Sequence, residues 1–87
     1  PFNDMLHGRI VTFQVFLKDK PGVLSAVLNI FAQSGGNILT INQGIPSNGC
    51  AAVTIGAETS GLEISMEEML TQARNVVGVL RCEILAG

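Results

Sequence analysis

The sequence predicts one small α+β domain, in which four strands form an antiparallel sheet and two helices pack on one face of it. Four runs of the chain are rich in apolar and β-branched residues at strand spacing, and two runs carry apolar residues at helical spacing. Turn-forming residues separate these runs. A chain of 87 residues is long enough for one modest core and too short for a second domain beside it.

A Pro-Gly turn joins the first strand to the first helix. Residues 10–17 are mostly β-branched, aromatic or aliphatic, and one side of their alternating pattern is fully apolar, which predicts a strand. Pro21 and Gly22 follow, and they specify a turn because proline fixes φ and glycine allows backbone angles that other residues avoid. The next apolar residues recur at i, i+3, i+4 and i+7, which predicts an amphipathic helix that stops before Gly35 and Gly36. These residues are Leu24, Val27, Leu28 and Phe31.

The second half of the chain repeats the alternation of strands and helix. Residues 37–45 and 50–57 predict the second and third strands, joined by a hairpin turn at residues 46–49. Ser65 and Glu68 have the Ser-x-x-Glu form of a capping box at the start of a second amphipathic helix, which Gly78 ends. Residues 79–85 alternate as a closing strand, so the predicted order is βαββαβ.

Four strands and two helices, each with one apolar face, are satisfied by a two-layer sandwich with both helices on the same side of the sheet. Right-handed crossovers then give the ferredoxin-like arrangement, with an antiparallel sheet in the order 4-1-3-2. The second and fourth strands would be edges, and a dimer would cover one of them. We expect the domain to span residues 9–87, and residues 1–8 to be a flexible N-terminal tail or the remnant of a longer protein.

The composition excludes several classes of function. The net charge is −2 and five cations are scattered along the chain, so a phosphate backbone is a poor partner and nucleic acid is not expected. Charged residues make up 14%, against roughly 25% in typical soluble domains, which suggests that another chain covers some surface. No apolar run reaches the ~20 residues of a membrane span and no signal peptide pattern opens the chain, so we expect a cytoplasmic protein without membrane contact.

Side chains for catalysis or metal binding are scarce. Cys50 and Cys82 lie far apart in strand-like runs, and we interpret them as small buried hydrophobic residues in a reducing compartment. His7 is the only histidine and falls in the tail, and the carboxylates do not cluster. We therefore expect no catalytic residue, no metal and no cofactor.

The Pro-Gly turn is the candidate binding site. Amides that open a helix lack partners and face a positive dipole end, so a carboxylate ligand could dock there. The predicted topology brings the start of the second strand, at Asn37, near the Asp19 turn, so the two could share a free amino acid. Its ammonium group suits Asp19, its carboxylate suits the amides, and the Asn37 amide can donate and accept. Read from the residues alone, the turn is equally consistent with a helix start that binds nothing.

The strings Asp19-Lys20-Pro21-Gly22-Val23-Leu24, Gly35-Gly36-Asn37-Ile38 and Val77-Gly78-Val79 resemble the ACT domain, a small regulatory module attached to enzymes of amino-acid metabolism. The resemblance covers residues 9–85. Residues 35–43 together with Ile45 and Pro46 further resemble the ACT proteins described as PheB or as chorismate mutase.

This resemblance implies a homodimer formed through the first helix and the second strand. It also implies amino-acid binding between one subunit's loop and another's strand, in the service of a fused or associated biosynthetic enzyme. The residues that it implies as ligand-binding are Asp19, Lys20, Gly22, Val23 and Leu24 of the loop and Asn37 and Ile38 of the strand.

Two features of this sequence limit the function that the resemblance implies. Serine-binding members tend to carry a histidine shortly before the loop, where this chain has Leu17, so a more apolar amino acid such as phenylalanine is the first candidate. Chorismate is a dicarboxylate whose rearrangement needs several cationic clamps, and Arg9, Arg74 and Arg81 fall on three separate elements. Isomerase activity would then belong to a missing N-terminal part. Some ACT domains bind nothing and only dimerise, which is the alternative.

Overall fold

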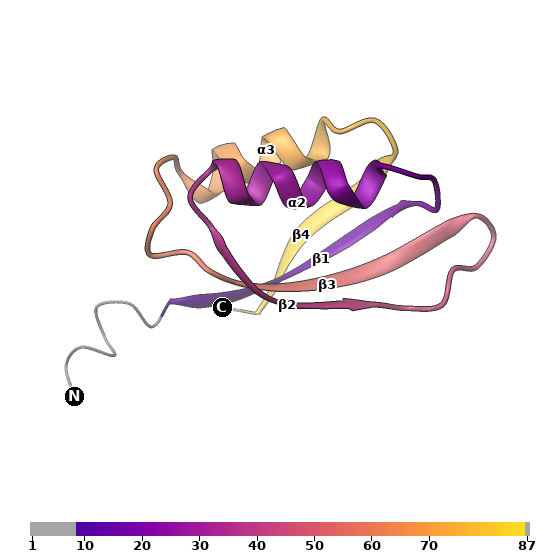
Figure 1. The fold of residues 1–87 in the computed structure, drawn as a ribbon, viewed down its shortest axis with the longest axis horizontal. Helices are drawn as coiled ribbons and strands as arrows, with labels where there is room; N and C mark the ends of the chain where they lie inside the picture. Colours follow the sequence, from indigo (N-terminus) through magenta and orange to yellow (C-terminus); the bar gives the residue numbers. More distant parts are fainter. Residues whose placement is uncertain (1–8, 87) are drawn as a thin grey trace.

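A computed structural model describes residues 9–86, and its elements follow the predicted βαββαβ order (Figure 1). The elements are β1 (Ile10–Lys18), α2 (Val23–Gln33), β2 (Asn37–Gln43), β3 (Cys50–Glu58), α3 (Met66–Arg74) and β4 (Val79–Ala86). The predicted N-terminal tail, with His7, lies outside the described residues.

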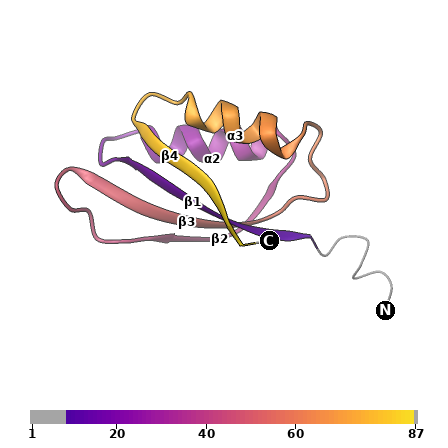
Figure 2. The ribbon, with the colours of Figure 1, turned by 180° about the vertical axis from the view of Figure 1, so that it is seen from behind.

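The four strands form one sheet in the order β2-β3-β1-β4, and every neighbouring pair is antiparallel. Both helices cover the same face of this sheet, and no helix of residues 9–86 lies on the opposite face (Figures 1 and 2). The predicted ferredoxin-like fold is therefore confirmed, with β2 and β4 as its edges.

The core lies between the sheet and the two helices. Alternate residues of β1 and β3 face the helices, as the pattern predicted, and the rings of Phe13 and Phe31 meet edge to face with centroids 4.9 Å apart. Cys82 is buried in this core and Cys50 is half-buried, and both thiols are free. Burial raises the pKa of the Cys82 thiol, because the thiolate would lose its hydration, whereas Arg74 opposes the shift.

The second strand differs from its prediction. It ends at Gln43 instead of residue 45, a register shift interrupts its pairing with β3 between Ile38 and Thr40, and apart from Ile38 its residues are exposed. One face of β2 was predicted to be buried, but as an edge strand it has a neighbour on one side only.

The register separates the two ends of the sheet. Lys18, at the end of β1, pairs with Cys50, whereas Ile10, at its start, pairs with Glu58 and so lies level with Asn37 of β2. From Ile10 to Lys18 the strand advances eight steps of roughly 3.3 Å, or about 26 Å. The loop that follows β1 and the start of β2 are therefore at opposite ends of the molecule (Figure 1).

Candidate functional site

The loop between β1 and α2 is fixed by backbone hydrogen bonds. The amide of Asp19 donates to the carbonyl oxygen of Gly49 in the β2–β3 hairpin at 2.8 Å, and the amide of Lys20 donates to the carbonyl oxygen of Lys18 at 2.9 Å. Two separate contacts thus hold the loop at the end of the sheet where the hairpin turns.

Gly22 begins the helix in a left-handed conformation, with φ 88° and ψ −16°. No side chain caps α2, and the amides of Leu24 and Ser25 have no partner among the described residues. A Cβ built on Gly22 would meet nothing within 4 Å, so the space beside these amides is open. Open amides at the positive end of a helix dipole are suited to a carboxylate.

A pocket of about 500 Å³ lies beside this helix start. One wall is formed by the loop and the first turn of α2, and the other by the turn between α3 and β4. Its lining residues are Lys18, Lys20, Pro21, Gly22, Val23, Ala26, Val76, Val77 and Gly78. Its volume falls within the range of small-molecule sites, about 300–1,000 Å³.

Gly78 joins the two walls of the pocket. Its carbonyl oxygen accepts from the amide of Lys18 at 2.8 Å, which ties the α3–β4 turn to the end of β1. Its φ is +104°, and a Cβ added there would lie 2.8 Å from Cγ2 of Val23. The backbone of the turn therefore packs directly against the first residue of α2, and this contact sets the separation of the walls.

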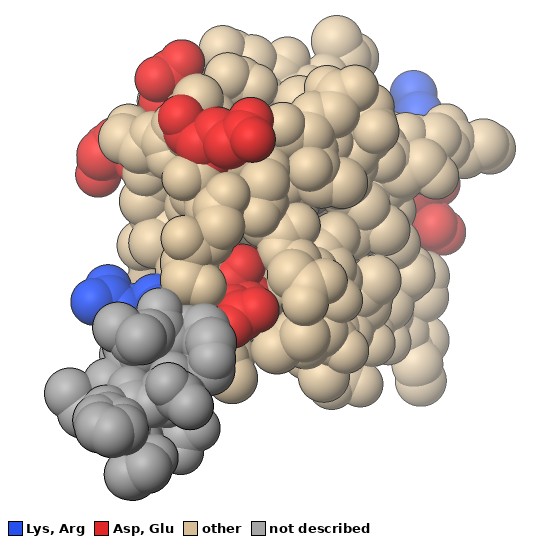
Figure 3. All heavy atoms as spheres, turned by 60° about the vertical axis from the view of Figure 1, so that its left-hand side comes forward, with Lys and Arg blue, Asp and Glu red and all other residues tan. Residues whose placement is uncertain are grey.

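Charge is distributed unevenly between the two ends of the molecule. Lys18 and Lys20 lie at the pocket, both exposed. At the other end are four glutamates, which belong to the end of β3, the β3–α3 connection and the first turn of α3: Glu58, Glu63, Glu67 and Glu68. Figure 3, which brings that end forward, shows more acidic than basic side chains. An anionic group is therefore favoured at the pocket over the opposite end.

The structure brings together only part of the predicted site. Lys20, Gly22 and Val23 line the pocket, and Asp19 and Leu24 adjoin it in the chain without lining it. Asn37 is exposed and Ile38 half-buried at the far end of the sheet.

The prediction that Asn37 and the Asp19 turn come near each other in one chain is wrong. Because β1 and β2 run in the same direction, with α2 returning the chain between them, the start of β2 lies level with the start of β1. A ligand that touches both segments requires a second copy of the chain.

The second wall of the pocket, formed by the α3–β4 turn, was not predicted from the sequence. Ala26, Val76 and Val77 were not among the candidate residues, although they line the pocket together with Gly78. A signal for this wall was present, because Val77-Gly78-Val79 was one of the three strings that carried the family resemblance.

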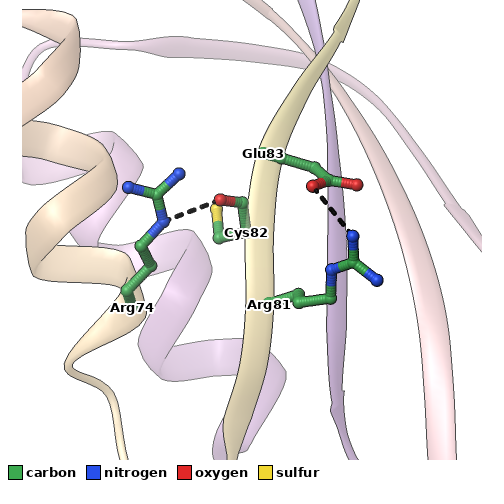
Figure 4. A network of polar contacts seen from close by, with 4 residues as sticks. All are labelled: Arg74, Arg81, Cys82 and Glu83. Carbon is green, nitrogen blue, oxygen red and sulfur yellow. Dashed lines mark hydrogen bonds and ion pairs between the residues drawn. The ribbon is translucent and has the colours of Figure 1, made fainter.

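The arginines do not converge. Arg74 Nε donates to the carbonyl oxygen of Cys82 at 2.8 Å, whereas Arg81 lies 3.5 Å from a carboxylate oxygen of Glu83 and over the ring of Phe16. Figure 4 shows Arg74 and the Arg81–Glu83 pair on opposite sides of β4. Arg9 precedes β1 at the end of the molecule away from the pocket. These side chains form no common anion clamp.

Residues 9–86 contain neither a group of metal ligands nor a membrane-spanning helix. No three His, Cys, Asp or Glu side chains are grouped so that they could hold a metal ion. No helix in this part of the chain is long and apolar enough to cross a membrane.

Comparison with solved structures finds the same fold in ACT domains. The ACT domain from the GTP pyrophosphokinase of Chlorobium tepidum matches with a TM-score of 0.69 and 18% identity, over 88% of this chain and 97% of that one. The small subunit of acetolactate synthase from Thermotoga maritima matches with a TM-score of 0.69 and 28% identity, over 87% of this chain and 47% of that one.

Comparison of sequences gives closer relatives. An ACT domain-containing protein of Caldanaerobacter subterraneus is 44% identical over 85 residues, which are 98% of this chain and 58% of the relative. One of Caldicellulosiruptor saccharolyticus is 45% identical over 85 residues, or 57% of its length. The chain thus spans less than two thirds of these relatives. The family model of the ACT domain matches residues 11–74, and the chain belongs to the ACT domain family.

Proposed function

We propose that this chain is a regulatory domain that binds an amino acid at the β1–α2 loop, in the service of an enzyme of amino-acid biosynthesis. The observation that carries the proposal is the pocket beside the start of α2. Two lysines and an apolar wall line this pocket, and the open amides of Leu24 and Ser25 adjoin it in the first turn of α2. A carboxylate matches the amides and lysines, and an apolar side chain matches the wall. ACT domains commonly bind amino-acid ligands, which supports the same assignment.

The proposed site is shared between two copies of the chain. The Asn37 and Ile38 of the same chain lie about 26 Å from the end of β1, so in this proposal they contribute to the site of the partner. The sequence of β2 contains no charged residue, and Leu39 and Ile41 are 48% and 44% exposed. An uncharged, partly apolar edge strand is suited to pairing with another strand. These features support a homodimer formed through α2 and β2.

The ligand that we propose first is phenylalanine. Leu17, which stands where serine-binding members tend to carry a histidine, is buried in the core, so it offers no polar group to a ligand. The resemblance of residues 35–43, with Ile45 and Pro46, to PheB-type and chorismate-mutase-type ACT proteins is the reason for proposing this amino acid.

We propose no isomerase activity for this chain alone, since Arg74 and Arg81 are held on opposite sides of β4. The proposed partner is a fused or associated cytoplasmic enzyme.

A thermal-shift screen of the common amino acids tests this function. A ligand at 100 times its Kd stabilises the folded state by about 2.7 kcal/mol, which raises the Tm of a domain of this size by several degrees. We expect phenylalanine or another apolar amino acid to raise the Tm, and serine to have little effect. If no amino acid changes the transition, sensing is rejected, and the alternative, a structural module that only dimerises through the β2 edge, takes its place.

A further inference from the structure

We infer that the side chain of the bound amino acid lies between α2 and the α3–β4 turn, and that Val77 sets which side chains are accepted. This inference rests on the proposed function and names the specificity wall of the same site.

Val77 is an exposed apolar residue in the lining of the pocket. The residue is 91% exposed, whereas Val76 beside it is half-buried. An apolar side chain in this position gains by being covered, because burial of apolar surface removes it from water. A ligand with an apolar side chain would cover it.

Charged and apolar side chains lie on different sides of the pocket. The charged side chains of the lining, Lys18 and Lys20, are confined to the loop side, next to the open α2 amides. Away from the loop, the lining consists of Ala26 on α2 and Val76 and Val77 on the turn. An amino acid whose carboxylate meets the amides therefore directs its side chain toward these apolar residues.

Two contacts fix the position of the α3–β4 turn relative to α2. The amide of Lys18 donates to the carbonyl oxygen of Gly78, and the backbone of Gly78 packs on Val23. Because the turn is tied to both β1 and α2, the width available to a side chain depends on the residues that project from the turn. Among the turn residues that line the pocket, Val77 is exposed, whereas Val76 and Gly78 are half-buried.

All of these residues belong to one chain, so each copy carries this wall by itself. In the proposed dimer, the Asn37 of the second copy meets the polar end of the ligand, and Val77 of the first copy meets its side chain.

Two substitutions of Val77 test the inference in the full chain. Because Val77 is exposed, both Val77→Trp and Val77→Ser should leave the fold and the dimer unchanged, which circular dichroism and light scattering would verify. Leu85→Trp on β4, which does not line the pocket, is the matched control. Binding of glycine, L-alanine, L-leucine and L-phenylalanine is measured for each protein by calorimetry.

We expect Val77→Trp to weaken the binding of leucine and phenylalanine roughly tenfold or more relative to alanine, because the larger residue fills the space of the ligand side chain. We expect Val77→Ser to weaken the same two ligands severalfold and the control to have no effect. If the wild-type chain binds an amino acid and neither Val77 variant changes the order of preference, the inference is wrong and the proposed function stands. If the wild-type chain binds none of the four, nor any other amino acid, both are wrong.

Discussion

Replacing Gly22 with aspartate places a negative charge where the ligand carboxylate is proposed to lie. A Cβ at this position meets nothing within 4 Å, so the side chain enters open space and the substitution creates no clash. The φ of 88° does impose strain on any side chain, about 1–2 kcal/mol, although Asp and Asn tolerate this region best. Gly22→Asn therefore carries similar strain without the charge, and the two variants should show similarly lowered Tm values, by roughly 4–8 °C per kcal/mol.

The size of the charge effect follows from the open position of the loop. Two negative charges about 5 Å apart repel by about 3 kcal/mol at an effective dielectric constant of about 20, and solvent around an exposed residue reduces this by about half. We therefore expect the aspartate variant to bind the amino acid found in the screen about tenfold more weakly than the asparagine variant, with the dimer retained in both.

Calorimetric titration at low salt measures the affinity of each variant for the amino acid. Size-exclusion chromatography on the same samples shows whether the dimer is retained. Raising the ionic strength should narrow the difference, because salt screens the repulsion. Equal affinity of the two variants would refute a carboxylate position at the start of α2, and the site would then have to be sought elsewhere.

Gly78→Ala should lower the free energy of unfolding by about 1–3 kcal/mol more than Gly49→Ala in chemical denaturation, because both have positive φ but only the former clashes. Ile41→Lys on β2 should convert the dimer to monomers, as measured by light scattering, whereas Leu80→Lys on β4 should leave the dimer unchanged. If both variants remain dimers, the interface does not lie at β2. Because burial raises the pKa of Cys82, the unfolded chain loses its thiol proton first. The contribution of this thiol to the free energy of unfolding should therefore be constant below the ordinary thiol pKa of 9.0 and fall above it, and Cys82→Ala should reduce the loss of stability above that pH.

The sheet and helices were predictable because burial in this fold follows local periodicity. Val53 and Ile55 pack in the core as the alternation of β3 required, and the Ser65 hydroxyl accepts from the amide of Glu68 at 3.0 Å, the first half of the predicted capping box. The exposure of β2 was not predictable in this way. Its pattern resembles that of a half-buried strand, and which of its residues are covered depends on a neighbour that one chain does not supply.

The walls of the pocket were harder to predict than the fold, because they combine segments far apart in the sequence. Gly22 was found from turn chemistry alone, since its positive φ is one that glycine favours. Val77 gave no signal in its own chemistry, because an apolar residue just past a helix is ordinary in a sequence. It was marked only by the family resemblance of Val77-Gly78-Val79, and the approach of Gly78 to Val23 places it near the start of α2.

Asn37 lies far from the β1–α2 loop of its own chain, contrary to the prediction, and this distance determines how the proposed site must work. Had Asn37 lain beside the loop, one chain would have held a complete site and ligand binding would have had no necessary effect on assembly. Because about 26 Å separates them along the sheet, a ligand that touches both must bind two copies at once, and it then favours the dimer by as much as the dimer favours the ligand. In the proposed arrangement, regulation follows from this reciprocity and requires no change of fold within the chain.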